Sequence, residues 1–213
     1  MALPFAMSKD SAPAGLNGPG AAQALLVEGS AVARSILNRV LCTAVHRRIA
    51  VHAVTTPQEA PPLLQGFDIA LIDIDLDDVA ALELIARLPS SCWRVATTLY
   101  DEEERLLPAL QMGVHGYLLK QDRYERQVEG LQRILRGGPD LSPALARSVL
   151  DGLRRAGDVA PEVDQILGAL GRGLSPKETA RALKCSVGDI HSTTARVYTL
   201  MRQPPATVLA RIS

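Results

Sequence analysis

Apolar residues recur over residues 24–136 in short runs that are separated by stretches of helical periodicity. Five runs have strand length, and they lie at residues 24–27, 49–54, 69–72, 95–98 and 117–119. In the intervening stretch at 32–45, apolar residues stand three or four positions apart, as one face of a helix requires. We therefore expect five β-α units across 24–136, forming an α/β fold with a five-stranded, doubly wound parallel sheet that helices cover on both faces.

The pattern changes after the glycines at 137 and 138. Ser142 followed by Pro143 is typical of a helix start, so we expect a linker helix that runs to about residue 155. Helical periodicity then predicts helices at about 161–170, 176–183 and 187–201, a further short helical stretch after residues 204–205, and no strand. The expected organisation is a disordered leader (1–22), an α/β domain (23–138), a linker helix (139–158) and an all-α domain (159–213).

Two helices of the all-α domain carry clear start signals. Ser175, Pro176 and Glu178 form a capping box with a proline at the first helical position. Ser186 and Asp189 form a second capping signature, after a turn of only three residues at 184–186. Two short, separately capped helices joined by so tight a turn predict a helix-turn-helix, the unit that places a helix in the DNA major groove.

Charge is distributed unevenly although its sum is zero. Residues 1–151 carry 14 basic and 18 acidic side chains, whereas residues 152–213 carry 9 and 5. The composition is 47% hydrophobic and 22% charged, which excludes wholesale disorder. An acidic front half and a basic tail indicate an anionic partner for the tail alone.

Targeting and cysteine patterns favour a cytoplasmic protein. No apolar run approaches the roughly 18 residues of a membrane helix, so we expect no membrane association. The first seven residues are too short for a secretory core and lack a preceding basic region. The three cysteines are widely spaced, which predicts free thiols and neither a disulfide framework nor a zinc site.

Polar residues follow four of the predicted strands at the end where a parallel sheet collects its functional groups. They are Glu28, Asp73, Thr98 and Lys120. With the segment Gly113-Val114-His115-Gly116-Tyr117-Leu118-Leu119-Lys120, this set resembles the receiver domain of two-component signalling. The resemblance implies that Asp73 accepts a phosphoryl group from a histidine kinase, that Thr98 and Lys120 contact that group, and that Tyr117 is the switch aromatic. Carboxylate phosphorylation needs such a nucleophile and cationic neutralisation of the phosphoryl oxygens.

The chain departs from the receiver pattern around the expected metal. The family carries two adjacent acids after the first strand, whereas here Glu28 is followed by Gly29. The carboxylate of Asp75 could replace the missing one, so the resemblance implies a Mg²⁺ site at Glu28, Asp73 and Asp75. Two versions remain open: Asp73 is phosphorylated with Mg²⁺ on a rearranged acid cluster, or the receiver is a scaffold that works without phosphorylation.

The tail resembles the LuxR-type DNA-binding domain of NarL/FixJ response regulators over about 159–202. The resemblance rests on Gly173-Leu174-Ser175, Lys177-Glu178, Ala180 and Leu183, followed by Ser186 and Ile190. It implies that a cationic set contacts DNA phosphates while a second set faces base edges. The first set is Lys177, Lys184 and Arg196, and the second is Asp189, His191, Ser192 and Thr194. So few cations predict modest affinity per monomer, so we expect a homodimer on double-stranded DNA.

We therefore expect a response regulator that controls transcription and is not an enzyme. One alternative is a module that uses the same scaffold to bind a protein instead of DNA. Another is a metal-dependent hydrolase on the acid cluster, which we disfavour because His46, His52, His115 and His191 all lie away from those strand ends. The sequence does not identify the kinase, the promoter, the dimer interface or a small-molecule effector.

Overall fold

The computed structural model of the chain describes residues 16, 20–157 and 159–201. The leader predicted over 1–22 therefore lies outside the described residues, apart from Leu16 and residues 20–22. Ala22 is already the first residue of a strand, so the α/β domain begins one residue earlier than expected.

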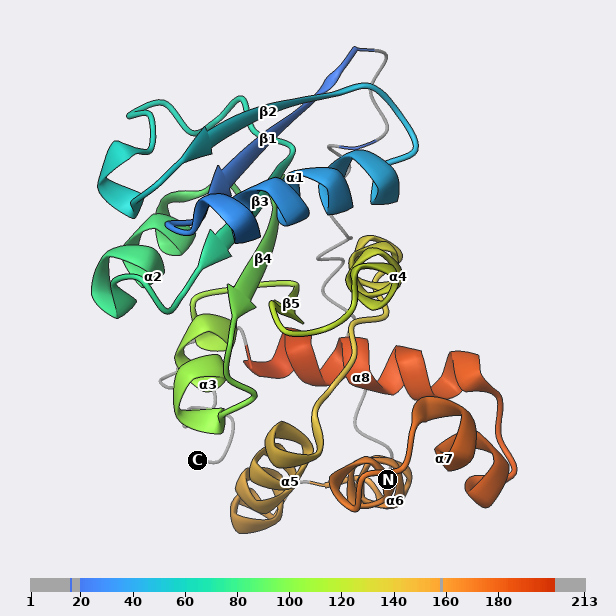
Figure 1. Ribbon diagram of the computed structural model, residues 1–213. Coiled ribbons are helices and arrows are strands. Elements are labelled where there is room, and N and C mark those ends of the chain that lie inside the picture. Colours follow the sequence, from blue (N-terminus) through green and yellow to red (C-terminus); the bar gives the residue numbers. More distant parts are fainter. Residues whose placement is uncertain (1–15, 17–19, 158, 202–213) are drawn as a thin grey trace.

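A five-stranded parallel sheet forms the centre of the first domain (Figure 1). Its strands, in chain order, are β1 (Ala22–Val27), β2 (Ile49–Val54), β3 (Ile69–Asp73), β4 (Trp93–Thr98) and β5 (Gly116–Leu119). They are hydrogen-bonded in the order β2-β1-β3-β4-β5, and every neighbouring pair is parallel. The predicted fold class is confirmed, and the apolar runs of the inner strands β1, β3 and β4 are buried on both faces, whereas the edge strand β2 is largely exposed.

Helices cover both faces of this sheet. On one face, α1 (Ala31–Ala44) and α4 (Tyr124–Leu135) pack Leu41 and Leu131 against alternate residues of the strands, such as Leu26 and Leu71. On the other face, α2 (Asp78–Arg87) and α3 (Glu103–Gln111) cover the remaining set of inward residues. Helix α3 continues through Pro108, so this proline does not end the helix.

The second of the five expected β-α units is incomplete. Between β2 and β3, in a segment that the structure describes throughout, the only helix is the short 3-10 turn η2 (Pro57–Glu59). The prediction of a helix in every unit is therefore wrong here. Prolines 57, 61 and 62 provide the physical reason, since a proline lacks the amide N–H that a helix interior needs.

After α4, the described residues form four more helices: α5 (Pro143–Ala156), α6 (Pro161–Gly171), α7 (Pro176–Leu183) and α8 (Val187–Met201). The short stretch predicted after residues 204–205 lies outside the described residues. The predicted caps are present, because Ser142 accepts a hydrogen bond from the Leu145 amide and Ser175 forms a complete capping box with Glu178. Residues 184–186 make the predicted turn, with Lys184 in the left-handed conformation (φ 56°). The helix-turn-helix corner predicted from the caps is thus confirmed.

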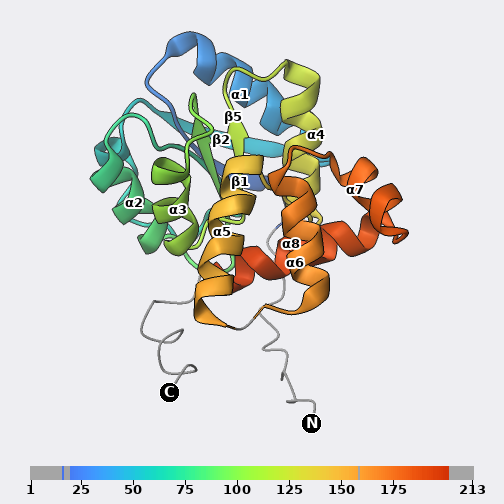
Figure 2. The ribbon, with the colours of Figure 1, turned by 90° about the horizontal axis from the view of Figure 1, so that it is seen from below.

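Helix α8 lies between the α/β domain and helices α5 and α6 (Figures 1 and 2). Apolar residues of α8, such as Ile190 and Val197, belong to the same buried cluster as Leu106 and Leu110 of α3. The two domains therefore share one hydrophobic core in this arrangement. Within the described residues, no helix is long and apolar enough to cross a membrane.

Candidate functional site

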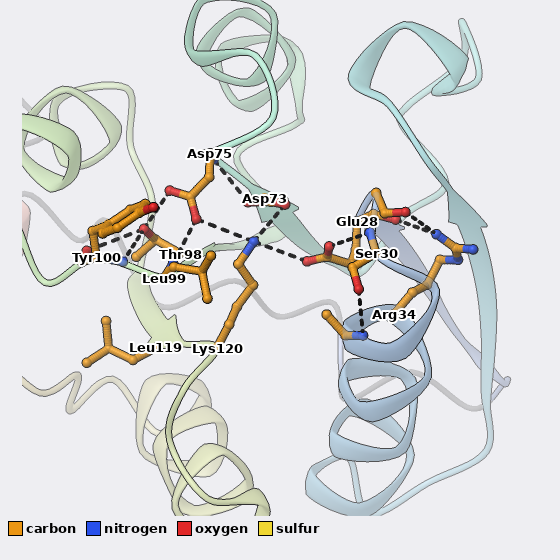
Figure 3. Close-up of polar contacts among 12 residues, drawn as sticks. Glu28, Ser30, Arg34, Asp73, Asp75, Thr98, Leu99, Tyr100, Leu119 and Lys120 are labelled. Atoms are coloured by element: carbon orange, nitrogen blue, oxygen red, sulfur yellow. Dashed lines mark hydrogen bonds and ion pairs between the residues drawn. The ribbon is translucent and has the colours of Figure 1, made fainter.

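The carboxyl ends of four strands bring the predicted receiver residues together (Figure 3). The Nζ atom of Lys120, just beyond β5, lies 2.7 Å from Oδ2 of Asp73 at the end of β3 and 3.4 Å from Oε2 of Glu28 just beyond β1. All three side chains are at least nine-tenths buried. One buried ammonium thus neutralises a cluster of acids, and the strand order explains why residues so distant in sequence meet.

Burial and proximity shift the acid–base behaviour of this cluster. Burial raises the pKa of Glu28, and the nearby charge of Asp73 raises it further, against the lowering effect of the Ser30 amide and of Lys120. Burial alone would lower the pKa of Lys120. The hydrogen bond to Asp73 and the charges of the three surrounding acids nevertheless hold it above its ordinary value. Lys120 therefore stays cationic, and Glu28 carries a charge less readily than an exposed glutamate does.

Asp75 is the third acid of the cluster, and its carboxylate is turned toward β4. Its Oδ1 accepts a hydrogen bond from the Thr98 hydroxyl (2.7 Å), and its Oδ2 accepts one from the Leu99 amide (2.7 Å). Lys120 lies 3.4 Å from Oδ2, and Arg105 of α3 lies 3.7 Å from Oδ1. The sequence pattern did not single out Arg105 or the Leu99 amide, since neither belongs to the strand-end set.

The residues of the predicted Mg²⁺ site are engaged by the chain's own groups in this arrangement. Hard carboxylate oxygens are the right chemistry for Mg²⁺, while the described residues contain no preformed group of three that could hold a metal ion. Lys120 contacts all three acids, and both oxygens of Asp75 are engaged by donors of β4 and the residue after it. The Mg²⁺ site at Glu28, Asp73 and Asp75 stays a prediction, and in this structure the Asp75 carboxylate accepts hydrogen bonds from Thr98 and Leu99.

The loop after β1 has Gly29 at the position where the receiver pattern has a second acid. A Cβ atom on Gly29 would lie only 2.7 Å from Cδ2 of Leu76, so Leu76 fills the space in which a larger residue would stand. Arg34 of α1 donates to the carbonyl oxygen of Glu28 at 2.6 Å and to that of Gly29 at 3.2 Å. This loop is therefore held by an apolar contact and a guanidinium.

Tyr117, the predicted switch aromatic, lies on β5 with its ring mostly buried. Its hydroxyl donates to Oδ1 of Asp101 at 3.4 Å. Burial raises the pKa of this phenol, and the charge of Asp101 raises it further. Tyr117 is therefore neutral and connects β5 with the segment that follows Thr98.

The residues predicted to contact DNA lie on the helix-turn-helix corner, and most of them are exposed. Lys177, Lys184, Asp189, Ser192 and Arg196 all reach solvent. Asp189 also caps α8, because its carboxylate accepts from the amide and hydroxyl of Ser186.

The other two predicted contacts differ. Thr194 is 2% exposed, and its hydroxyl donates to the His191 carbonyl at 2.9 Å, so it does not face a base edge in this structure. The reason is helical spacing, because Ile190, Thr194 and Tyr198 recur every four residues on the buried face of α8. His191 is half-buried, and its Cβ would lie 3.2 Å from a Cβ on Gly138, in the loop that follows α4.

Comparisons with known proteins agree with this architecture. No protein-family model matches the chain. The chain is 25% identical over 127 residues to the transcriptional regulatory protein UhpA of Escherichia coli, and equally to that of Salmonella typhimurium. These matches cover 60% of the chain, which spans 64% of the length of either relative. Among solved structures, a two-component response regulator of the LuxR family from an Aurantimonas species matches with a TM-score of 0.50 and 22% identity, over 62% of this chain and 98% of that one.

A doubly wound sheet with an acid–lysine cluster at its carboxyl edge, followed by a helix-turn-helix corner, is the arrangement expected of a two-component response regulator. In sequence the chain is similar to the UhpA regulators, and in fold it is similar to a LuxR-family two-component response regulator.

Proposed function

We propose that this chain is a transcription regulator that binds double-stranded DNA through the α7–α8 corner. The observation that carries the proposal is the corner itself. The turn at 184–186 joins two capped helices. Three cations of this corner are exposed, namely Lys177, Lys184 and Arg196. The relative UhpA is named as a transcriptional regulatory protein, which supports the same output for this chain.

The receiver then acts as a control element for this output. Because only three predicted phosphate contacts per protomer give weak electrostatic affinity, we infer that two copies bind one duplex. The acid cluster is neutralised from within, since Lys120 pairs with Asp73, Glu28 and Asp75. These contacts support the version in which the receiver works without conventional phosphorylation by a histidine kinase.

Duplex binding by matched variants tests the proposal. Arg196→Ala and His191→Ala should weaken binding at least several-fold, because they remove an exposed cation and a half-buried side chain that are predicted to contact DNA. Arg126→Ala is the control, since Arg126 is an exposed cation of α4 in the first domain and its loss changes the net charge equally. If Arg126→Ala weakens binding as much as Arg196→Ala, or if none of the three proteins binds duplex DNA, the corner is not a DNA-reading element. A module that docks a protein partner would then be favoured.

A further inference from the structure

Two hydrogen-bond donors at the end of β4 and one ammonium just beyond β5 converge on the carboxylate of Asp75 (Figure 3). The Thr98 hydroxyl and the Leu99 amide each lie 2.7 Å from one of its oxygens, and the Lys120 ammonium lies 3.4 Å from Oδ2. A hydroxyl, a backbone N–H and an ammonium in one place form an anion site. The chain fills this site with its own carboxylate.

The loop after β3 positions that carboxylate. The Asp75 amide donates to Oδ1 of Asp73 at 3.0 Å, which is a turn of the kind that aspartate side chains make with the backbone two residues ahead. The Asp75 side chain is 10% exposed, so few water molecules compete for its oxygens. Its place at the mouth of the acid cluster is therefore fixed by a local contact on one side and by β4 on the other.

The same donors are those that a phosphoryl group on Asp73 would need. Phosphoryl oxygens require cationic neutralisation and hydrogen-bond donors at close range. A hydroxyl and an amide each have one hydrogen to donate, and those of Thr98 and Leu99 are already directed at Asp75. A phosphoryl group on Asp73 would also place its negative charge beside the two remaining carboxylates, Glu28 and Asp75, with one ammonium to share.

The segment after Thr98 is fastened by the same contacts. The Tyr100 amide donates to the Thr98 hydroxyl oxygen at 3.0 Å, so this hydroxyl donates to Asp75 and accepts from Tyr100. Arg105 lies against Asp75 and also stacks over the Tyr100 ring, 4.9 Å from its centre. Asp75 is thus the common acceptor for residues on both sides of this segment.

We propose that the Asp75 carboxylate is a permanent internal substitute for the phosphoryl group. It holds residues 98–101 in the position that phosphorylation of Asp73 would otherwise select. The proposal rests on the function proposed for the receiver as a control element. Asp75 is thus a positioning residue, and residues 98–101 stay in this one conformation without phosphorylation.

Amide hydrogen exchange at Leu99 and Tyr100 tests this proposal in the full chain. The wild type should protect both amides. Asp75→Ala and the near-isosteric Asp75→Asn should each increase their exchange rates by about tenfold or more, because the anionic acceptor is lost. Asp122→Asn is the matched control, since it removes one carboxylate charge near the same edge of the sheet but from an ion pair with Arg126 outside the cluster, and it should keep both amides protected. Thermal melting of each variant establishes that the sheet is intact.

Beryllofluoride, a phosphoryl analogue added with Mg²⁺, separates this role from a purely structural one. It should leave the wild type unchanged and should restore protection in Asp75→Ala, but not in the double variant that also carries Asp73→Asn. Added protection in the wild type, equal loss in Asp122→Asn and Asp75→Ala, or no restoration in Asp75→Ala would each overturn the proposal. None of these measurements involves DNA, so the failure of DNA binding would leave their result unaffected.

Discussion

The hydroxyl of Tyr198 donates a hydrogen bond to the backbone carbonyl of Asp140 across 2.7 Å. Tyr198 is a fully buried residue of α8, whereas Asp140 lies in the segment between α4 and α5. This bond joins α8, the proposed DNA-reading helix, to the segment that leaves the α/β domain. Together with the contact of His191 on Gly138, it keeps part of α8 covered.

Removing this bond should loosen the helix-turn-helix domain from the receiver. We expect Tyr198→Phe to lower the free energy of unfolding by about 1 kcal/mol, as is usual for one buried hydrogen bond, and to raise duplex affinity several-fold. Melting curves and DNA titration measure the two effects. Tyr124→Phe is the control, because it removes a hydroxyl that joins α4 to Thr43 of α1 and should leave DNA affinity unchanged. Weaker DNA binding by Tyr198→Phe would contradict this role.

Lys184 combines a strained backbone with an exposed cation. Its φ of 56° favours glycine, so Lys184→Gly should stabilise the fold by about 1 kcal/mol. The same substitution removes a predicted phosphate contact, so the logarithmic salt dependence of DNA binding should become shallower by about 1 per protomer. Opposite changes in stability and binding would confirm both roles. An unchanged salt dependence would remove Lys184 from the DNA surface.

The pH dependence of stability should reveal the buried Glu28. Burial raises the pKa of Glu28 in the folded state above the ordinary value of 4.5. The contribution of Glu28 to the free energy of unfolding is therefore fully favourable below pH 4.5, and it is lost as the pH rises through the folded-state pKa. Glu28→Gln should therefore melt roughly 2–4 °C higher than the wild type at pH 7, and the gap should close near pH 4. Glu59→Gln should not melt higher at pH 7, because hydrogen bonds from Thr55 lower the pKa of Glu59. A lower melting temperature for Glu28→Gln at pH 7 would show that its charge stabilises the cluster.

Phospho-transfer to Asp73 should be absent or slow. We expect no phosphoryl mass gain when the wild type is incubated with acetyl phosphate and Mg²⁺, because Lys120 and Thr98 are engaged by the chain's own carboxylates. Asp75→Ala should gain one phosphoryl group, and adding Asp73→Asn should abolish that gain. A stoichiometric gain by the wild type would restore the conventional switch.

The periodicity of the chain predicted most of this fold because each element satisfies its own local rules. Apolar runs such as 69–72 have the length and composition of buried strands, and the caps at Ser142 and Ser175 fix where helices begin. The exception between β2 and β3 is also local, since its prolines were visible in the sequence. The meeting of Asp73 with Lys120 followed from the rule that parallel strands share one functional edge.

The finer features depend on tertiary contacts that no local rule contains. The direction of the Asp75 carboxylate depends on its bond to Thr98, 23 positions away. Thr194 was predicted to face a base edge, but it is buried where α8 packs against the rest of the molecule. Helical periodicity alone does not tell which polar residues of α8 are covered by neighbouring elements.

The salt dependence of duplex binding by the full-length wild type tests the central claim most directly. With Lys177, Lys184 and Arg196 from each of two protomers on phosphates, the logarithm of the binding constant should fall with the logarithm of salt concentration with a slope of about −5. A slope near zero, or no binding at low ionic strength, would contradict a DNA-binding response regulator.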